Sequence, residues 1–279
     1  MTDLSRCLEF TDLIDRYDAL ILDVYGVLVD LSGALPGAVD WIDTLNRRGK
    51  PYWLASNTAA RLPESAARRY QAFGLDIPAE RMLSAGMLLR PYFAEHGLAG
   101  SRVRVLGPED SQAYVVRAGG RIAAPGEPFD VLVVADQAGF PFVDSVDEVL
   151  SHLVEVIDAG RRLPMLLPNP DRIYPTGRGI GFTAGAIADL IEGVLAQRYP
   201  GQDGLRFTRL GKPYPGLFEE VVRRAGSRKL VMVGDQLETD ILGAVRFGID
   251  SALVPGLLTG AKRTLDGVAP TYVLTRGGC

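Results

Sequence analysis

The chain of 279 residues contains few of the side chains that bind soft metals or form covalent cross-links. It has two cysteines, Cys7 and Cys279, and two histidines, His96 and His152. Two cysteines near opposite ends exclude a disulfide framework and a cysteine metal site, and they fit a reducing compartment, so we predict a cytoplasmic protein. Neither histidine has neighbours at metal-ligand spacing, and we interpret both as structural or surface residues.

Long hydrophobic runs and clusters of one charge are also missing. No apolar run approaches the roughly 20 residues that cross a bilayer, and the acidic N-terminal segment does not resemble a secretory signal. We therefore expect no membrane partner. The formal net charge is −4 with Lys and Arg scattered along the chain, which argues against a nucleic acid partner. There is no internal repeat, and the segment at 200–204 is the most linker-like.

What the chain does contain is a regular alternation of short apolar runs and amphipathic stretches. With 47% hydrophobic and 23% charged residues it can bury a large core. Apolar residues recur at spacings of three and four over 37–48, 63–73 and 215–225, which predicts helices. Strands alternating with helices predict an α/β fold with a parallel sheet. The expected strands lie in the runs 19–26, 51–58, 103–110, 129–136, 163–171, 230–236 and 251–256.

Carboxylates follow two of these runs. Parallel sheets bind ligands beyond the carboxyl ends of their strands, so polar residues at those ends are the candidate site. Asp23 follows the first run, and Gly26 lets the chain turn away; Asp235 follows a later run, and Asp240 comes five residues on. Such carboxylates can converge on a hard cation. Each pattern taken singly is also ordinary turn or cap chemistry, with Thr239 or Asp240 as a helix cap.

Two further segments carry groups suited to phosphate. Lys212 precedes a proline-framed turn, and near a metal-bound phosphate it would neutralise charge and keep a carboxylate ionised. Ser56 ends the second run, and the amides that follow could cradle phosphate oxygens at a helix start. The alternative is that Lys212 is merely solvated and that Ser56, Asn57 or Thr58 only caps the helix.

Taken in order, these four segments resemble the four motifs of the haloacid dehalogenase superfamily: a nucleophile aspartate, a serine or threonine, a lysine and an acidic pair. The resemblance spans nearly the whole chain. Asp23 and Ser56 are 33 residues apart, whereas Ser56 and Lys212 are 156 apart, so an inserted cap falls in the second gap. This arrangement is similar to subgroup IIA, which contains the nucleotide-sugar-associated, pyridoxal phosphate and phosphoglycolate phosphatases. Further matching segments are PGAVDWIDTLNRRGK (36–50), NPD (169–171), GAI (185–187), GKPYP (211–215) and LLTG (257–260).

The resemblance implies a two-part architecture. The core would be a Rossmann-like three-layer sandwich formed by residues 1–98 and 207–279, and a smaller α/β cap would cover 99–206. A closing cap excludes water and contacts the substrate, so specificity is expected there. The expected partner is a small phosphorylated metabolite. Similar proteins form homodimers through their caps, and a homodimer remains an option.

The resemblance also implies roles for individual residues. Magnesium is the expected cofactor, held by the carboxylates of Asp23 and Asp235 and the carbonyl of Tyr25, with Asp240 acting through water or from behind the direct ligands. Asp23 would attack phosphorus and form an aspartyl phosphate. The other expected contacts to substrate or phosphate are Ser56, Asn57, Thr58, Asn169, Asp171, Lys212 and the glycine-rich loop 177–185.

Tyr25 departs from the family's pattern. Phosphatases of the superfamily carry a second aspartate at this position, which protonates the leaving oxygen and then activates water. A carboxyl titrates near 4 and a phenol near 10, so Tyr25 can donate a proton but accepts one poorly at neutral pH. Losing acid and base assistance slows a reaction about 100- to 10,000-fold. A sensor that binds a phosphometabolite with little turnover, and a phosphotransferase, therefore remain alternatives.

The Asp-x-Tyr-Gly pattern also occurs in the haloacid dehalogenases themselves, which use an ester intermediate and no metal. Their cap interrupts the first gap, and their last motif lacks a metal-binding carboxylate pair. In this chain the first gap is too short for a cap, and both Asp235 and Asp240 are present. Without a cation these carboxylates would repel Asp23 with little beyond Lys212 to offset the repulsion. Magnesium-dependent phosphate chemistry is therefore preferred to dehalogenation.

Overall fold

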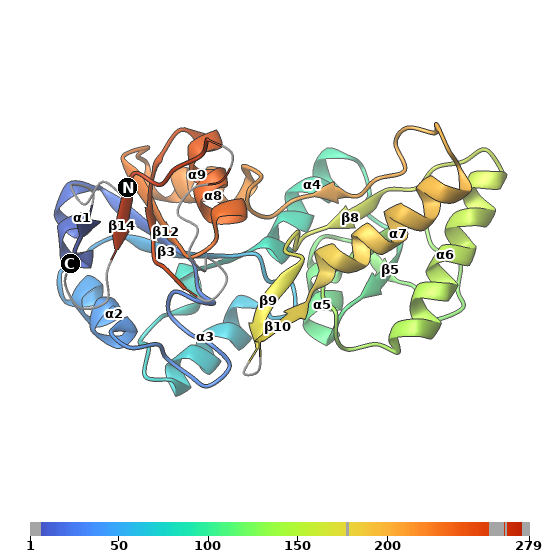
Figure 1. Cartoon of the computed structure of the whole chain (residues 1–279). Coiled ribbons are helices and arrows are strands. Elements are labelled where there is room, and N and C mark those ends of the chain that lie inside the picture. The colour runs from blue at the N-terminus through green and yellow to red at the C-terminus, as the bar shows by residue number, and fades with distance from the viewer. Residues whose placement is uncertain (1–6, 177–178, 257–264, 266, 275–279) are drawn as a thin grey trace.

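The computed structural model describes residues 7–176, 179–256, 265 and 267–274. Within these ranges the chain forms two parallel sheets with helices on both faces and one antiparallel hairpin between the two sheet units (Figure 1). The predicted α/β class with parallel sheets is thus confirmed. The LLTG segment at 257–260 lies outside the described residues, as do residues 177 and 178 of the predicted glycine-rich loop.

The larger sheet has the order β1-β14-β13-β12-β2-β3-β4, and all its neighbouring strands are parallel. This order places β12 beside β2, although the two are far apart in sequence. The carboxyl ends of β2, β3 and β12 therefore meet at one edge. The strands are β1 (Cys7–Leu8), β2 (Ala19–Leu22), β3 (Tyr52–Ser56), β4 (Met82–Ser84), β12 (Leu230–Gly234), β13 (Asp250–Leu253) and β14 (Tyr272–Leu274).

The second sheet has the order β11-β8-β7-β5-β6, and it is also parallel. Each of the seven apolar runs predicted to be strands overlaps a strand of one of the two sheets. The remaining strands are β5 (Arg102–Leu106), β6 (Arg121–Ile122), β7 (Val131–Val134), β8 (Met165–Leu167), β11 (Thr208–Arg209) and the hairpin of β9 (Ile173–Thr176) with β10 (Gly179–Phe182).

The three predicted helices correspond to α2, α3 and α8, each within two residues of the expected bounds. Among the helices in the described ranges, none combines the length and apolarity that crossing a bilayer requires. The helices are α1 (Phe10–Arg16), α2 (Ala38–Arg47), α3 (Pro63–Ala72), α4 (Leu89–Glu95), α5 (Glu109–Arg117), α6 (Phe142–Asp158), α7 (Ala184–Arg198), α8 (Gly216–Ala225) and α9 (Leu242–Phe247).

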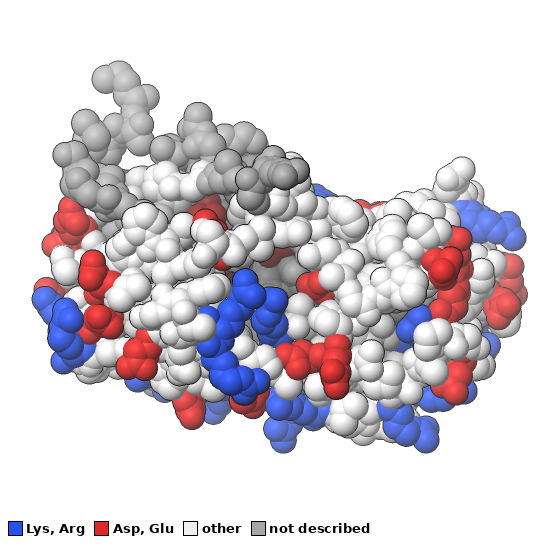
Figure 2. All heavy atoms as spheres, turned by 90° about the horizontal axis from the view of Figure 1, so that it is seen from below, with Lys and Arg blue, Asp and Glu red and all other residues white. Residues whose placement is uncertain are grey.

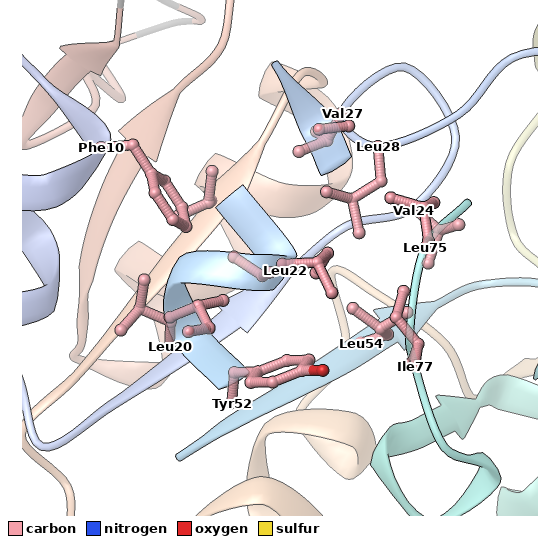
Figure 3. Packing of buried hydrophobic residues seen from close by; sticks show 14 of the residues in the cluster. Phe10, Leu20, Leu22, Val24, Val27, Leu28, Tyr52, Leu54, Leu75 and Ile77 are labelled. Atoms are coloured by element: carbon pink, nitrogen blue, oxygen red, sulfur yellow. The ribbon is translucent and has the colours of Figure 1, made fainter. Parts of the chain in front are cut away.

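Alternate side chains of the central strands enter two different cores. Leu20 and Leu22 of β2 pack with residues of α1, α2 and α3, including Phe10 (Figure 3), whereas Ala19 and Ile21 pack with residues of α8 and α9. In the second sheet the same alternation along β7 divides its side chains between α6 and α7 on one face and α4 and α5 on the other. A strand covered on both faces is apolar at every position, which explains the continuous runs in the sequence.

Candidate active site

Three carboxylates meet at the edge where β2 and β12 end. Asp23 directly follows β2, and its amide donates to the carbonyl of Val233 in β12. Asp235 directly follows β12, and Asp240 lies in the π-helical turn Leu237–Ile241. Oxygen atoms of the three carboxylates lie within 4.8 Å of one another, and all three side chains are buried. The topology thus brings together the three acids that the sequence singled out.

Two glycines make room for this cluster. Gly26 has φ +94°, and a Cβ there would lie 2.2 Å from Oδ2 of Asp235. A Cβ on Gly234 would lie 2.3 Å from the Cβ of Asp240. Both distances are far below van der Waals contact, so the absence of a side chain is what allows the backbone to approach the carboxylates so closely.

Lys212 joins two of the acids. Its side chain is 2% exposed, and Nζ donates to Oδ1 of Asp23 at 2.7 Å and to Oδ1 of Asp240 at 2.6 Å. Lys212 is held in turn by Asn57, whose Oδ1 accepts from the Lys212 amide at 2.7 Å and whose Nδ2 donates to the Lys212 carbonyl at 2.9 Å. Within the described ranges, Lys212 pairs with Asp23 and Asp240, and the crowding of three carboxylates at this point suits a cation.

The pKa directions of these groups reflect burial and crowding. Desolvation raises the pKa of Asp23 to about 7, with Asp240 adding to the rise and Lys212 opposing it. Desolvation and the charges of Asp23 and Asp240 hold the pKa of Asp235 well above its usual range. Desolvation disfavours the ammonium of Lys212, but Asp23 and Asp240 outweigh it and raise the Lys212 pKa. Ionised acids are thus costly here until more positive charge is supplied.

The segment after β3 differs from expectation. Ser56 is buried at the end of β3, and its Oγ accepts from the Thr58 amide at 3.3 Å. The next helix, α3, begins at Pro63 and has Leu62 as its N-cap. The expectation that Ser56 to Thr58 lie at a helix start, or cap it, is therefore wrong, and their amides belong to a loop. The loop is compatible with phosphate binding because its amides follow the same sheet edge.

The NPD segment lies against this loop. Asn169 donates to Oγ1 of Thr183 at 3.1 Å, and its Oδ1 accepts from the Asp171 amide at 3.1 Å. Oδ1 of Asp171 accepts from Nδ2 of Asn57 at 2.8 Å. Asn57 therefore bridges Asp171 and Lys212, which are far apart in sequence. Burial raises the pKa of Asp171 to about 6, with Asn57 and Lys212 opposing the rise and Asp240 adding to it.

Tyr25 faces the hairpin. Its hydroxyl donates to the carbonyl of Pro175 in β9 at 3.2 Å, and its ring meets that of Tyr174 edge to face at 6.4 Å between centroids. Desolvation, with smaller effects from Asp30 and Tyr174, raises the pKa of Tyr25 to about 12. A phenol in this state is a weaker acid than an ordinary tyrosine and is almost entirely protonated at neutral pH, which disfavours the predicted proton transfer by this hydroxyl.

A cavity of about 620 Å³ opens between the two sheet units and is lined by residues of both. Figure 2 shows the surface hollowed between the units, with basic and acidic side chains near the rim. The predicted residues that line the cavity are Asp23, Tyr25, Ser56, Asn57, Thr58, Asn169, Asp171 and Lys212. Asp235 and Asp240 are not among its lining residues; Asp240 pairs with Lys212, and Asp235 lines a separate cavity of about 380 Å³.

Sequence reasoning overlooked four other charged residues of this cavity: Arg61, Glu109, Asp110 and Asp136. Asp136 comes two residues after the end of β7 and closes an apolar run, so the rule about polar residues at strand ends would have found it. Arg61 lies in the loop before α3, where no local pattern distinguishes it from the other arginines nearby.

Comparison with known proteins agrees with this geometry. A model described as haloacid dehalogenase-like hydrolase matches residues 20–121, and one described as HAD-hydrolase-like matches 209–276. The crystal structure of a possible sugar phosphatase of the HAD superfamily from Cytophaga hutchinsonii is 30% identical, covers 96% of this chain and 97% of its own, and superposes with a TM-score of 0.80. The chain belongs to the haloacid dehalogenase superfamily.

Two further proteins are similar to this chain along most of its length. The acid sugar phosphatase of Staphylococcus aureus is 24% identical over 92% of this chain and 94% of its own. A glycerol phosphate phosphatase from Mycobacterium tuberculosis, solved in complex with magnesium, is 23% identical and has a TM-score of 0.74, covering 94% of this chain and 75% of its own. At this identity the second likeness shows that the two share the superfamily fold.

Proposed function

We propose that this chain is a magnesium-dependent hydrolase of a small phosphorylated metabolite, with Asp23 as the nucleophile. The observation that carries the proposal is the cluster of Asp23, Asp235 and Asp240, whose carboxylate oxygens lie within 4.8 Å of one another. The names of its relatives, sugar phosphatase and glycerol phosphate phosphatase, support phosphate monoesters as the substrate class. Placement in subgroup IIA fits the same relatives.

The donor set fits magnesium. Magnesium prefers oxygen ligands and is commonly held by one or two carboxylates while it keeps several waters. The carboxylates of Asp23 and Asp235 would hold the ion together with the carbonyl of Tyr25. Asp240 would act through water or through Lys212, from which it accepts a hydrogen bond. When bound, the ion would offset the negative charge of the phosphate and of the carboxylates. The same charge balance supports phosphate chemistry over metal-free dehalogenation.

The residues of the chain supply the remaining parts of the reaction. Asp23 forms a bond to phosphorus as the ester bond to the leaving oxygen breaks. Lys212, Ser56 and the amides after it lie where they can stabilise charge on the other phosphate oxygens. Water then attacks the aspartyl phosphate, which releases inorganic phosphate and restores Asp23.

The second sheet is proposed to be the cap. Under this proposal residues 1–98 and 207–279 form the core and residues 99–206 form the cap, with β11 just beyond the second boundary although it pairs with β8 of the cap sheet. Asn169 and Asp171 would contact the substrate from the cap side of the cavity, while Asn57 and Thr58 would do so from the core. Closure of the cap would exclude bulk water from the cavity while the phosphoryl group passes to Asp23.

An assay of 4-nitrophenyl phosphate with and without magnesium tests the proposal. We expect turnover with magnesium and a loss of about 100-fold or more after chelation, because metal stabilisation of transition-state charge is worth several kcal/mol. Addition of magnesium after chelation should restore the rate. Undetectable turnover together with tight binding of inorganic phosphate would contradict the proposal and support the phosphometabolite sensor, which the tyrosine at position 25 favours.

A Tyr25→Phe variant separates the two roles open to this residue. The variant keeps the ring that meets Tyr174 and loses only the hydrogen bond to Pro175. A net hydrogen bond contributes about 0.5–1.5 kcal/mol, so we expect kcat to change by about tenfold at most. If the hydroxyl were the proton carrier, kcat would fall about 100- to 10,000-fold. Steady-state kinetics with phenyl phosphate, whose leaving group needs a proton, distinguishes the two.

A further inference from the structure

The position that carries the second aspartate in other phosphatases of the superfamily has another task in this chain. The Tyr25 hydroxyl donates its proton to the carbonyl of Pro175 in the hairpin. A protonated phenol cannot accept a proton from water, and the proton of this one is held by the carbonyl and is not free for a leaving oxygen. The proposed reaction needs both transfers. A different cavity residue must therefore supply them.

Asp171 is placed to do so. It lies in the loop between β8 and β9, lines the same cavity as Asp23, and is held through one oxygen by Asn57. Asn57 in turn forms hydrogen bonds with both the backbone amide and the backbone carbonyl of Lys212. The ammonium of Lys212 contacts Asp23. Asp171 is thus tied to the nucleophile by a chain of three short hydrogen-bonded contacts. Such a chain restricts where the Asp171 carboxyl can lie relative to Asp23.

The other carboxyls of the cavity, apart from Asp23, are less suitable. Asp110 accepts from the Leu62 amide at 2.9 Å, and Glu109 is an exposed residue at the first turn of α5. Asp136 accepts a hydrogen bond from the Ala138 amide. The nearby charge that affects the pKa of Asp136 is that of Arg61, which lowers it. Asp171, in contrast, is influenced by the charges of the nucleophile's own cluster.

We propose that Asp171 is the general acid and base of this active site, in place of the aspartate that is missing at position 25. The proposal rests on the proposed function. In the first step the Asp171 carboxyl gives its proton to the ester oxygen as the P–O bond breaks and the Asp23–phosphorus bond forms, so that a neutral alcohol leaves. In the second step the Asp171 carboxylate takes a proton from water as the water oxygen bonds to phosphorus. The bond to Asp23 breaks, and both side chains return to their initial state.

The surroundings of Asp171 suit both halves of this cycle. Burial raises its pKa to about 6; Asn57 and Lys212 lower it, and Asp240 raises it. The neighbouring residue Arg172 has a carboxylate partner of its own, because it forms an ion pair with Asp189 on α7. A carboxyl with this pKa is protonated in a useful fraction of molecules near neutral pH and is still a competent base, as general acid–base catalysis requires.

The test is an Asp171→Asn variant of the full chain, assayed with magnesium on a series of substituted phenyl phosphates. Asparagine can still accept the hydrogen bond from Asn57, so the loop should keep its position. We expect kcat/KM for phenyl phosphate to fall about 100-fold or more, and for 4-nitrophenyl phosphate by less than about tenfold, because nitrophenolate leaves without a proton. Rapid mixing with 4-nitrophenyl phosphate should then show a burst of nitrophenol followed by slow turnover.

Two further variants guard against a merely structural effect. Asp171→Glu keeps a carboxyl and should recover part of the activity on phenyl phosphate, whereas Asp136→Asn, in the same cavity, should act equally on all members of the series. An equal loss across the series in Asp171→Asn, or no loss, would overturn the role of Asp171. If Asp23→Asn were inactive in that case, the proposed function would still stand, so the two failures are distinguishable.

Discussion

An Asp23→Asn variant is expected to fold and to lose at least about 10,000-fold in kcat, as enzymes deprived of their nucleophile do. The carboxylate is replaced by an amide, which is too weak a nucleophile to attack phosphorus. The fold should survive because the amide oxygen can still accept a hydrogen bond from Lys212, which keeps its second bond to Asp240. Removing one of three crowded carboxylates also relieves repulsion.

The measurement is turnover of 4-nitrophenyl phosphate with magnesium, accompanied by a thermal melt of each protein. Asp30→Asn is the matched control. Asp30 lies in the same loop after β2 but accepts from the Ser32 amide and hydroxyl and is not part of the carboxylate cluster. It should retain activity near that of the wild type. Activity of Asp23→Asn within tenfold of the wild type, in a protein that melts normally, would reject Asp23 as the nucleophile.

The sequence predicts the sheets well because a strand that is buried on both faces is apolar at every position. Each of the seven predicted runs overlaps a strand, and the two motif carboxylates follow strands that turn out to be neighbours. The convergence of Asp23 and Asp235 is therefore a consequence of strand order. The close approach of their backbones depends on Gly26 and Gly234, and a pattern of residues alone does not show which glycines have this task.

Contacts between the two sheet units are what the sequence does not predict. Tyr25 and Pro175 are 150 residues apart, and Asn57 and Asp171 are 114 residues apart, so no local rule pairs them. The loop after Ser56 is a related case. Its serine, asparagine and threonine are typical of a helix start, but α3 begins only at Pro63, where proline supplies the start signal instead. Side chains that favour caps also favour loops.

An Asp235→Asn variant is expected to be more stable than the wild type without metal and to gain much less stability from magnesium. Burial and the charges of Asp23 and Asp240 raise the pKa of Asp235, so its ionised form is disfavoured in the folded state. At pH 8, which lies above the pKa of Asp235 in the unfolded chain, burial of this carboxyl lowers the free energy of unfolding. Asparagine, which carries no charge, removes that cost. A gain on the order of 1 kcal/mol raises Tm by roughly 2–4 °C for a chain of about this size.

Magnesium should reverse the order of the two proteins. A ligand at 100 times its Kd stabilises the folded state by about 2.7 kcal/mol, and the wild type should gain this while the variant, which lacks one ligand, should gain little. Melting curves at pH 8 with chelator and with a magnesium series measure both effects without any substrate. Asp203→Asn, an exposed residue in the turn after α7, should follow the wild type in both conditions. Equal magnesium stabilisation of wild type and Asp235→Asn would contradict a metal held by this carboxylate, because a cation bound elsewhere would not respond to the loss of its charge.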